Sequence, residues 1–73
     1  MNATNLVLQA ITETLEEYAA TPGDGYLQGR VSGLLSAALL GDLISSEEHG
    51  AFSVRSREIG LAYSRQLEAA AAR

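Results

Sequence analysis

The sequence predicts an all-α fold, in which an N-terminal antiparallel helical hairpin is followed by a longer third helix and two copies form a dimeric helical bundle. Apolar residues recur at three- and four-residue spacing in three segments, which is the periodicity of one helix face. Turn-forming and helix-capping residues separate these segments. We therefore expect 1–73 to be a single helical domain, with helices at about 5–20, 25–41 and 46–70.

The first segment has the pattern of an ordinary amphipathic helix. Thr4 or Asn5 supplies a short polar side chain that can cap the first turn. The helix is expected to end near Ala20, because Pro22 disfavours helical geometry in the residue before it. The side opposite the apolar face carries Glu13, Glu16 and Glu17. We interpret these glutamates as a solvated face, with an acidic surface for a basic partner as the alternative.

A short turn joins the first two segments. Residues 22–25 read Pro-Gly-Asp-Gly, a run of strong helix breakers, and Asp24 is placed to cap the helix that follows. Two helices joined by so few residues usually pack against each other in opposite directions. The turn therefore predicts the antiparallel hairpin.

The second segment contains Val31–Leu40, a run without any charged residue, which we expect to form the buried axis of the fold. The side of this helix opposite its core face carries small residues at intervals of four: Gly29, Gly33, Ala37 and Gly41. Because these residues have almost no side chain, the row predicts close packing of a second helix, within the chain or between two copies. The alternative is glycine tolerated on a solvent-facing side.

The third segment begins with a capping box, the most specific local signal in the sequence. Ser45 and Glu48 lie three residues apart, so each side chain can bond the backbone amide of the other. An unbroken helix from here to the C-terminus would be roughly 39 Å long, against about 24 Å for each of the other two. The part of this helix that extends beyond the other two has nothing in the same chain to pack against, which favours a homodimer. A break at Gly50 or Gly60 is the alternative.

Apolar residues that fall outside the helix core faces are the candidates for a protein interface. We expect contacts with a partner from Leu39, Leu40, Val54 and Leu61. Arg57 and Tyr63 are candidate anchors, because arginine and tyrosine contribute strongly to interface energies. These six residues form the predicted protein interface.

The composition of the chain disfavours several classes of function. The chain has no cysteine, so neither disulfides nor thiolate-bound metal stabilise it. Its net charge of −4 disfavours unspecific binding to nucleic acid or anionic membranes. The uncharged run is about half as long as a bilayer-spanning helix, and the first residues lack the basic start of a secretory signal. We therefore expect a cytoplasmic protein without membrane contact.

No set of residues indicates catalysis, a metal site or a cofactor. His49 is the only histidine, and Asp42 and Ser45 lie close enough in sequence for a hydrolytic triad to be considered. The serine is better explained by the cap, and so short a chain has little room for an oxyanion site and a substrate cleft. One histidine beside Glu47 and Glu48 supplies too few metal ligands. We expect no enzyme activity; a pH-sensing role for His49 is an alternative.

A small DNA-binding transcriptional regulator is the main alternative function. Ala37 and Gly41 have the alanine-to-glycine spacing of the helix-turn-helix motif, and a capped helix follows them. However, Glu47 and Glu48 would lie at the start of the recognition helix, where they repel phosphate. The arginines of the third segment also point in different directions around the helix. A nucleic-acid partner is therefore disfavoured.

By elimination, the sequence predicts a non-catalytic protein-binding module that self-associates and binds another protein, with inhibition of that protein as one outcome. In size and composition the chain resembles the small helical proteins with which phages and plasmids block host regulators or defence systems. That resemblance implies an antagonist of a host regulator or defence protein. A helical oligomer that encloses a small ligand is a third hypothesis.

Overall fold

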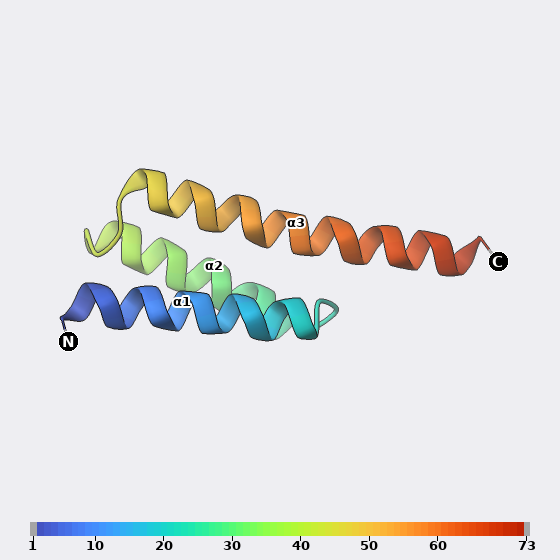
Figure 1. The fold of residues 1–73 in the computed structure, drawn as a ribbon, viewed down its shortest axis with the longest axis horizontal. Coiled ribbons are helices and arrows are strands. Elements are labelled where there is room, and N and C mark those ends of the chain that lie inside the picture. The colour runs from blue at the N-terminus through green and yellow to red at the C-terminus, as the bar shows by residue number, and fades with distance from the viewer. Residues whose placement is uncertain (1, 73) are drawn as a thin grey trace.

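The structure, a computed structural model, describes residues 2–72 and contains three helices in that range (Figure 1). They are α1 (Ala3–Ala20), α2 (Gly25–Leu40) and α3 (Ser46–Ala71), and no strand occurs between residues 2 and 72. The predicted all-α class is therefore confirmed.

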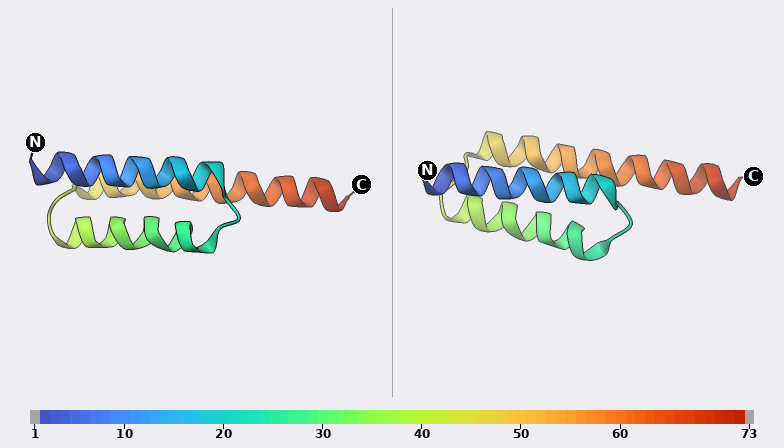
Figure 2. Two further views of the ribbon diagram at one scale, coloured as in Figure 1. Left: turned by 90° about the horizontal axis from the view of Figure 1, so that it is seen from below. Right: turned by 60° about the horizontal axis from the view of Figure 1, so that its bottom comes forward.

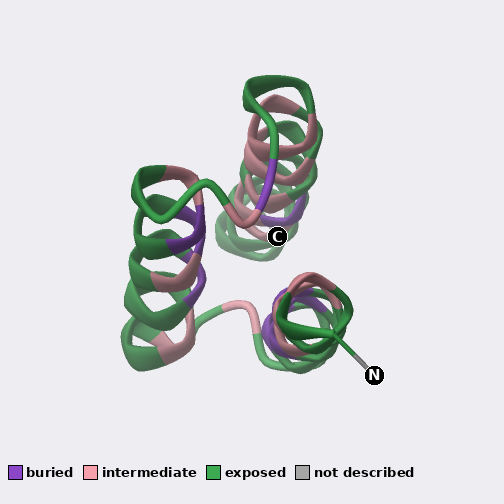
Figure 3. Ribbon diagram, turned by 90° about the vertical axis from the view of Figure 1, so that its left-hand side faces the viewer, coloured by how far each residue is buried: buried purple, intermediate pink, exposed green. Residues whose placement is uncertain are grey.

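The helices pack side by side along a molecule that measures 49 × 19 × 15 Å. α2 runs back alongside α1, and α3 lies against both in the direction of α1 (Figures 1 and 2). Seen end on, the buried residues face a common centre between the helices (Figure 3). The C-terminal part of α3 extends past the turn between α1 and α2, where no other helix of the described chain accompanies it (Figure 2).

The first two helices begin at residues whose side chains accept free backbone amides of the first turn. Asp24 caps α2 as predicted, with its Oδ1 atom 2.9 Å from the amide of Tyr26. At α1 the expected cap at Thr4 or Asn5 is wrong. The cap is Asn2, whose Oδ1 atom accepts the amide of Asn5 at 2.8 Å. Asn2 is as good a cap as either, and using it lengthens the helix at its N-terminus.

The capping box at the start of α3 is confirmed. The hydroxyl of Ser45 accepts the amide of Glu48 at 3.0 Å, and the carboxylate of Glu48 accepts the amide of Ser45 at 2.8 Å. From this cap α3 continues through Gly50 and Gly60 without a break. The long third helix is therefore a single rod, of which Ile59 is the only buried residue within the described range.

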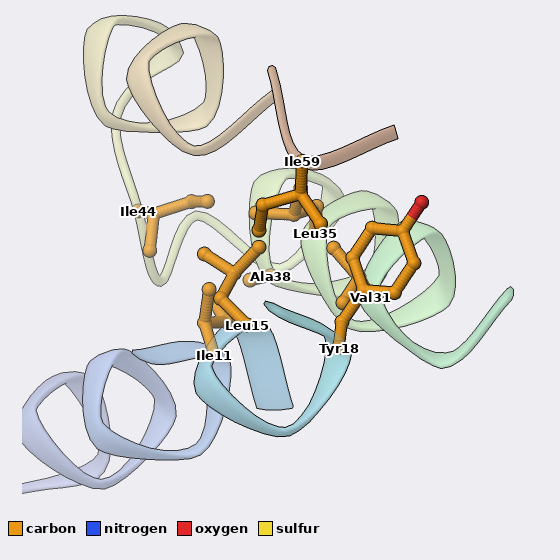
Figure 4. Close-up of a cluster of buried hydrophobic side chains, with 8 residues drawn as sticks. All are labelled: Ile11, Leu15, Tyr18, Val31, Leu35, Ala38, Ile44 and Ile59. Atoms are coloured by element: carbon orange, nitrogen blue, oxygen red, sulfur yellow. The ribbon is translucent and has the colours of Figure 1, made fainter. Parts of the chain in front are cut away.

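The core is a cluster of hydrophobic side chains from all three helices and the connection before α3 (Figure 4). Its buried hydrophobic members are Ile11, Leu15, Tyr18, Val31, Leu35, Ala38, Ile44 and Ile59. Thr14 is buried with them, and its hydroxyl donates to the carbonyl of Ala10 in the preceding turn at 2.7 Å. The polar atom is thus satisfied within its own helix.

The expectation that α2 is a buried axis is wrong. Only Val31, Leu35 and Ala38 of α2 are buried, whereas α1 contributes four buried residues. In a group of three helices each helix turns one face inward, so even a helix with a single charged residue keeps an exposed side. Between residues 2 and 72 no helix combines the length and apolarity needed to cross a membrane.

Candidate functional site

The predicted interface residues fall into two groups. Leu39 is half-buried and packs against the core, and Tyr63 is half-buried over the turn between α1 and α2. These two are therefore less available to a partner than we expected. The other members are exposed on two separate helices: Leu40 on α2, and Val54, Arg57 and Leu61 on α3.

The exposed side of α2 forms a surface that we call the α2 outer strip. It consists of Tyr26, Gly29, Gly33, Ala37 and Leu40, all of which are exposed. Tyr26 is 71% exposed and Leu40 is 86% exposed, so the two bulky ends of the strip are open to solvent. Between them lie Gly29, Gly33 and Ala37, which have almost no side chains, on the side of α2 opposite its buried residues.

The small residues of α2 make no close helix crossing within the chain. A Cβ atom added at Gly29 or Gly33 would meet nothing within 4 Å. A Cβ atom at Gly41 would meet the carbonyl of Ala37 at 3.3 Å, a neighbour in its own helix turn and not a second helix. The expected packing against another helix of the same chain is therefore wrong, and packing between two copies stays a prediction.

The second exposed surface, the α3 outer strip, consists of Val54, Arg57 and Leu61. Val54 and Leu61 are 45% and 48% exposed. They are seven residues apart on a continuous helix, so they lie on nearly the same side, with Arg57 close to the line between them. The strip combines two apolar side chains with a central guanidinium group.

The arginines of α3 do not form one basic face. Arg55 and Arg57 are separated by about 160° around the helix, and Arg65 lies roughly midway between them, because each residue advances the helix by about 100°. A helix laid in a DNA groove presents one side to it. Arg55 and Arg57, however, lie on widely separated sides of α3.

A groove of about 680 Å³ lies between α2 and α3, and the sequence did not predict it. Serine hydroxyls line both of its walls: Ser32, Ser36, Ser53, Ser56 and Ser64. Gln28, His49 and Arg57 also line it. Ser32 and Ser36 are four residues apart, a spacing that puts both on one side of a helix, but their pairing with α3 depends on the tertiary fold.

Tyr18 contributes the floor of this groove from α1. Its ring belongs to the core cluster, and its hydroxyl points away from the aliphatic side chains (Figure 4). The hydroxyl oxygen lies 3.3 Å from the position of a Cβ atom at Gly60, another residue that lines the groove. The missing side chain at Gly60 thus makes room for the phenol.

The residues considered for chemistry are not assembled into a reaction centre. Ser45 is engaged in the capping box, and His49 lines the groove, which Asp42 does not line. Within residues 2–72, no three histidine, aspartate or glutamate side chains are placed to hold a metal ion. The groove offers hydroxyl, amide, imidazole and guanidinium groups, a set suited to hydrogen bonding.

Comparisons with models of protein families, with curated proteins and with solved structures found no match to this chain. The geometry of the two outer strips and of the groove is therefore the basis for a functional proposal.

Proposed function

We propose that the chain is a non-catalytic protein-binding module that forms a homodimer through the α2 outer strip and binds another protein through the α3 outer strip. The observation that carries the proposal is the symmetry of the α2 outer strip about Gly33. Its small and bulky residues are arranged so that one copy of the strip fits a second copy.

The residue spacing along α2 supports the proposed dimer. Tyr26 and Leu40 are each seven residues from Gly33, and Gly29 and Ala37 are each four residues from it. When two α2 helices cross in opposite directions with a twofold axis at Gly33, Tyr26 faces Leu40 of the partner subunit. Gly29 then faces Ala37 of the partner subunit. A twofold interface requires this kind of self-complementary surface.

The small residues and the low charge of α2 support this arrangement. Packed helices are usually about 8–10 Å apart, and residues without side chains allow a closer approach with more van der Waals contact. Arg30 is the only charged residue of α2, so pairing two such helices removes few charges from water. In a monomer, Gly33 would lower the stability of α2 by about 1 kcal/mol relative to alanine, and no helix contact would offset this cost.

The α3 outer strip is proposed as the surface for the second protein. Two half-exposed aliphatic side chains flank Arg57, and arginine is enriched among residues that dominate binding energy. The strip lies on a different helix from the dimer surface, so one dimer would present two copies of it. A module of this kind suits an antagonist that covers a site on a host regulator or defence protein.

Sedimentation equilibrium over a range of protein concentrations tests the dimer. The wild-type chain is expected to sediment as a dimer that dissociates on dilution. Gly33→Leu adds a bulky side chain at the proposed axis, where the monomer has open space. We expect this variant to remain helical by circular dichroism but to sediment as a monomer.

Gly50→Leu is the matched control, because a Cβ atom at Gly50 also meets nothing within 4 Å and lies on α3. It makes the same substitution and leaves the α2 outer strip intact. A dimer that survives Gly33→Leu, or a wild type that is monomeric at every concentration, would overturn the α2 interface.

Affinity capture from bacterial lysate, with and without nuclease, tests the binding of a second protein. We expect a nuclease-resistant protein partner in fixed ratio, lost on Val54→Asp and retained on Leu6→Asp. Leu6 is a comparably exposed leucine, but it lies on α1. Recovery of nucleic acid, or of partners that vanish after nuclease treatment, would instead support the DNA-binding alternative.

A further inference from the structure

The groove between α2 and α3 has a composition unlike that of the rest of the protein. The chain carries nine acidic residues against five arginines, yet none of the described residues that line the groove is aspartate or glutamate. The ionisable side chains along it include Arg57 and His49, both of which can donate hydrogen bonds. An acidic protein thus has an acid-free groove that contains a permanent positive charge.

The Tyr18 hydroxyl is a polar group that lacks a partner at the floor of this groove. Tyr18 is only 2% exposed, and its hydroxyl makes no hydrogen bond with any residue between 2 and 72. In the same part of the chain, no fully buried side-chain nitrogen or oxygen lacks a partner. The unpaired phenol oxygen is therefore open to the groove, where a bound molecule can reach it.

The size and polarity of the groove indicate what it can hold. From His49 to Ser64 it follows α3 for about 22 Å, at about 1.5 Å per residue. Its volume of about 680 Å³ lies within the range of sites for small molecules. A groove that binds a protein helix is normally apolar, whereas this one combines apolar residues such as Leu35 and Leu61 with serine and tyrosine residues on both walls and the floor.

We propose that this groove binds a small phosphorylated polyol, the chemical class of the sugar phosphates. The guanidinium group of Arg57 matches the geometry of a phosphate and would bind it. The serine hydroxyls and the phenol of Tyr18 would exchange hydrogen bonds with the hydroxyl groups of the ligand. This activity goes beyond the proposed protein binding. No residue of the α2 outer strip lines the groove, whereas Arg57 and Leu61 of the α3 outer strip do, and Val54 does not.

Titration of the uniformly ¹⁵N-labelled full chain at constant ionic strength tests the proposal. Ribose 5-phosphate is the probe, and ribose and inorganic phosphate are its two halves. We expect ribose 5-phosphate to give saturable shifts of amide signals along the facing sides of α2 and α3. Ribose is expected to give none, and phosphate alone to bind more weakly.

Variants connect these shifts to the groove. Tyr18→Phe removes one hydrogen bond and should weaken binding about fivefold, whereas Arg57→Gln removes a charged contact and should weaken it more than about tenfold. Arg30→Gln is the charge-matched control, because Arg30 does not line the groove, and it should bind like the wild type. Ser53 lines the groove and is not a member of the core cluster. Ser53→Leu adds a bulky side chain there and should abolish binding, which keeps the test valid if Tyr18→Phe fails to fold.

Three results would overturn the proposal. They are the absence of saturable shifts at millimolar ribose 5-phosphate, equal binding of phosphate alone, and unchanged binding by Ser53→Leu. Dimerisation of Ser53→Leu and partner capture by Val54→Asp are measured separately. Val54 and the α2 outer strip do not line the groove. A failed titration therefore leaves dimerisation and Val54-dependent partner capture untouched, and a failed dimer leaves the groove untouched.

Discussion

The backbone amide of Leu43 donates to the carbonyl of Ala38 at 2.8 Å and closes the C-terminus of α2. Inside this closure the amide of Asp42 donates to the carbonyl of Leu39 at 3.1 Å. These two bonds form a Schellman motif, whose left-handed position usually holds glycine. Here that position is Asp42, with φ of 57°, while Gly41 precedes it at φ of −85°. Gly41 therefore lies one residue before the left-handed position, where glycine would be most favourable.

Asp42→Gly is expected to stabilise the fold by about 1 kcal/mol. The left-handed conformation is unfavourable for residues with a side chain, and glycine adopts it freely. The substitution also removes a negative charge from the C-terminal end of α2, where the helix dipole disfavours it. The change should appear as a higher midpoint of urea unfolding with an unchanged slope.

Asp42→Ala separates these two causes. It removes the charge but keeps a side chain at positive φ, so we expect it to be no more stable than the wild type. A gain equal to that of Asp42→Gly would assign the whole effect to the charge and contradict the backbone explanation.

A second pair of residues ties the turn between α1 and α2 to α3. A Cβ atom at Gly23 would lie 2.7 Å from the hydroxyl oxygen of Tyr63 and 3.1 Å from its Cζ atom. Gly23→Ala should therefore destabilise the fold by about 1–2 kcal/mol, because the half-buried ring must shift. Gly25→Ala is the control, since a Cβ atom there meets nothing within 4 Å.

A double-mutant cycle tests whether Tyr63 causes the effect. In a Tyr63→Phe background the closest overlap is gone, so Gly23→Ala should destabilise the fold less by about 0.5–1 kcal/mol. Strict additivity of the two substitutions, measured by urea unfolding, would show that the stability lost in Gly23→Ala does not come from contact with the Tyr63 hydroxyl.

Features set by neighbours in sequence were predictable. The turn at 22–25, the Asp24 cap and the Ser45 capping box depend on residues within a few positions of one another, and all three occur in the structure. The wrongly predicted cap of α1 also concerns residues that are neighbours in sequence. Asn2, Thr4 and Asn5 are all competent caps, and their sequence does not decide between them.

Features set by packing between helices were not predictable. Periodicity identified the small-residue side of α2, but not that it faces solvent in the chain, because a helix with one charged residue gives no clear contrast between its sides. The groove was missed because its serines lie on two helices and its floor is Tyr18, from a third. Their meeting depends on the crossing of the helices, which no spacing within one segment encodes.

The C-terminal part of α3 is expected to open most readily. Every described residue after Tyr63 in α3 is exposed, and this part of the helix passes beyond α1 and α2 (Figure 2). At protein concentrations below dimerisation, hydrogen exchange should be fastest among helical amides at 66–71. Amides near the buried Ile59 should exchange more slowly. Equal protection along the whole of α3 would show that its end is held by contacts absent from the single chain.

Thr14 provides a test of what the buried polar group of α1 contributes. It is 2% exposed, and its hydroxyl bonds the carbonyl of Ala10, which also accepts an amide within the helix. Removing the hydroxyl therefore leaves no other group unpaired. Thr14→Val, which keeps the volume, should change the free energy of unfolding by less than about 1 kcal/mol.

Thr14→Ala and Thr14→Ser both remove the buried methyl group, and each should destabilise the fold by about 1–2 kcal/mol because a cavity remains. The serine variant keeps the hydroxyl, so its loss reports packing alone. If Thr14→Val is instead as destabilising as Thr14→Ala while Thr14→Ser matches the wild type, the hydroxyl must stabilise the core through more than its local bond. In that case the threonine was retained for its polarity and not for its shape.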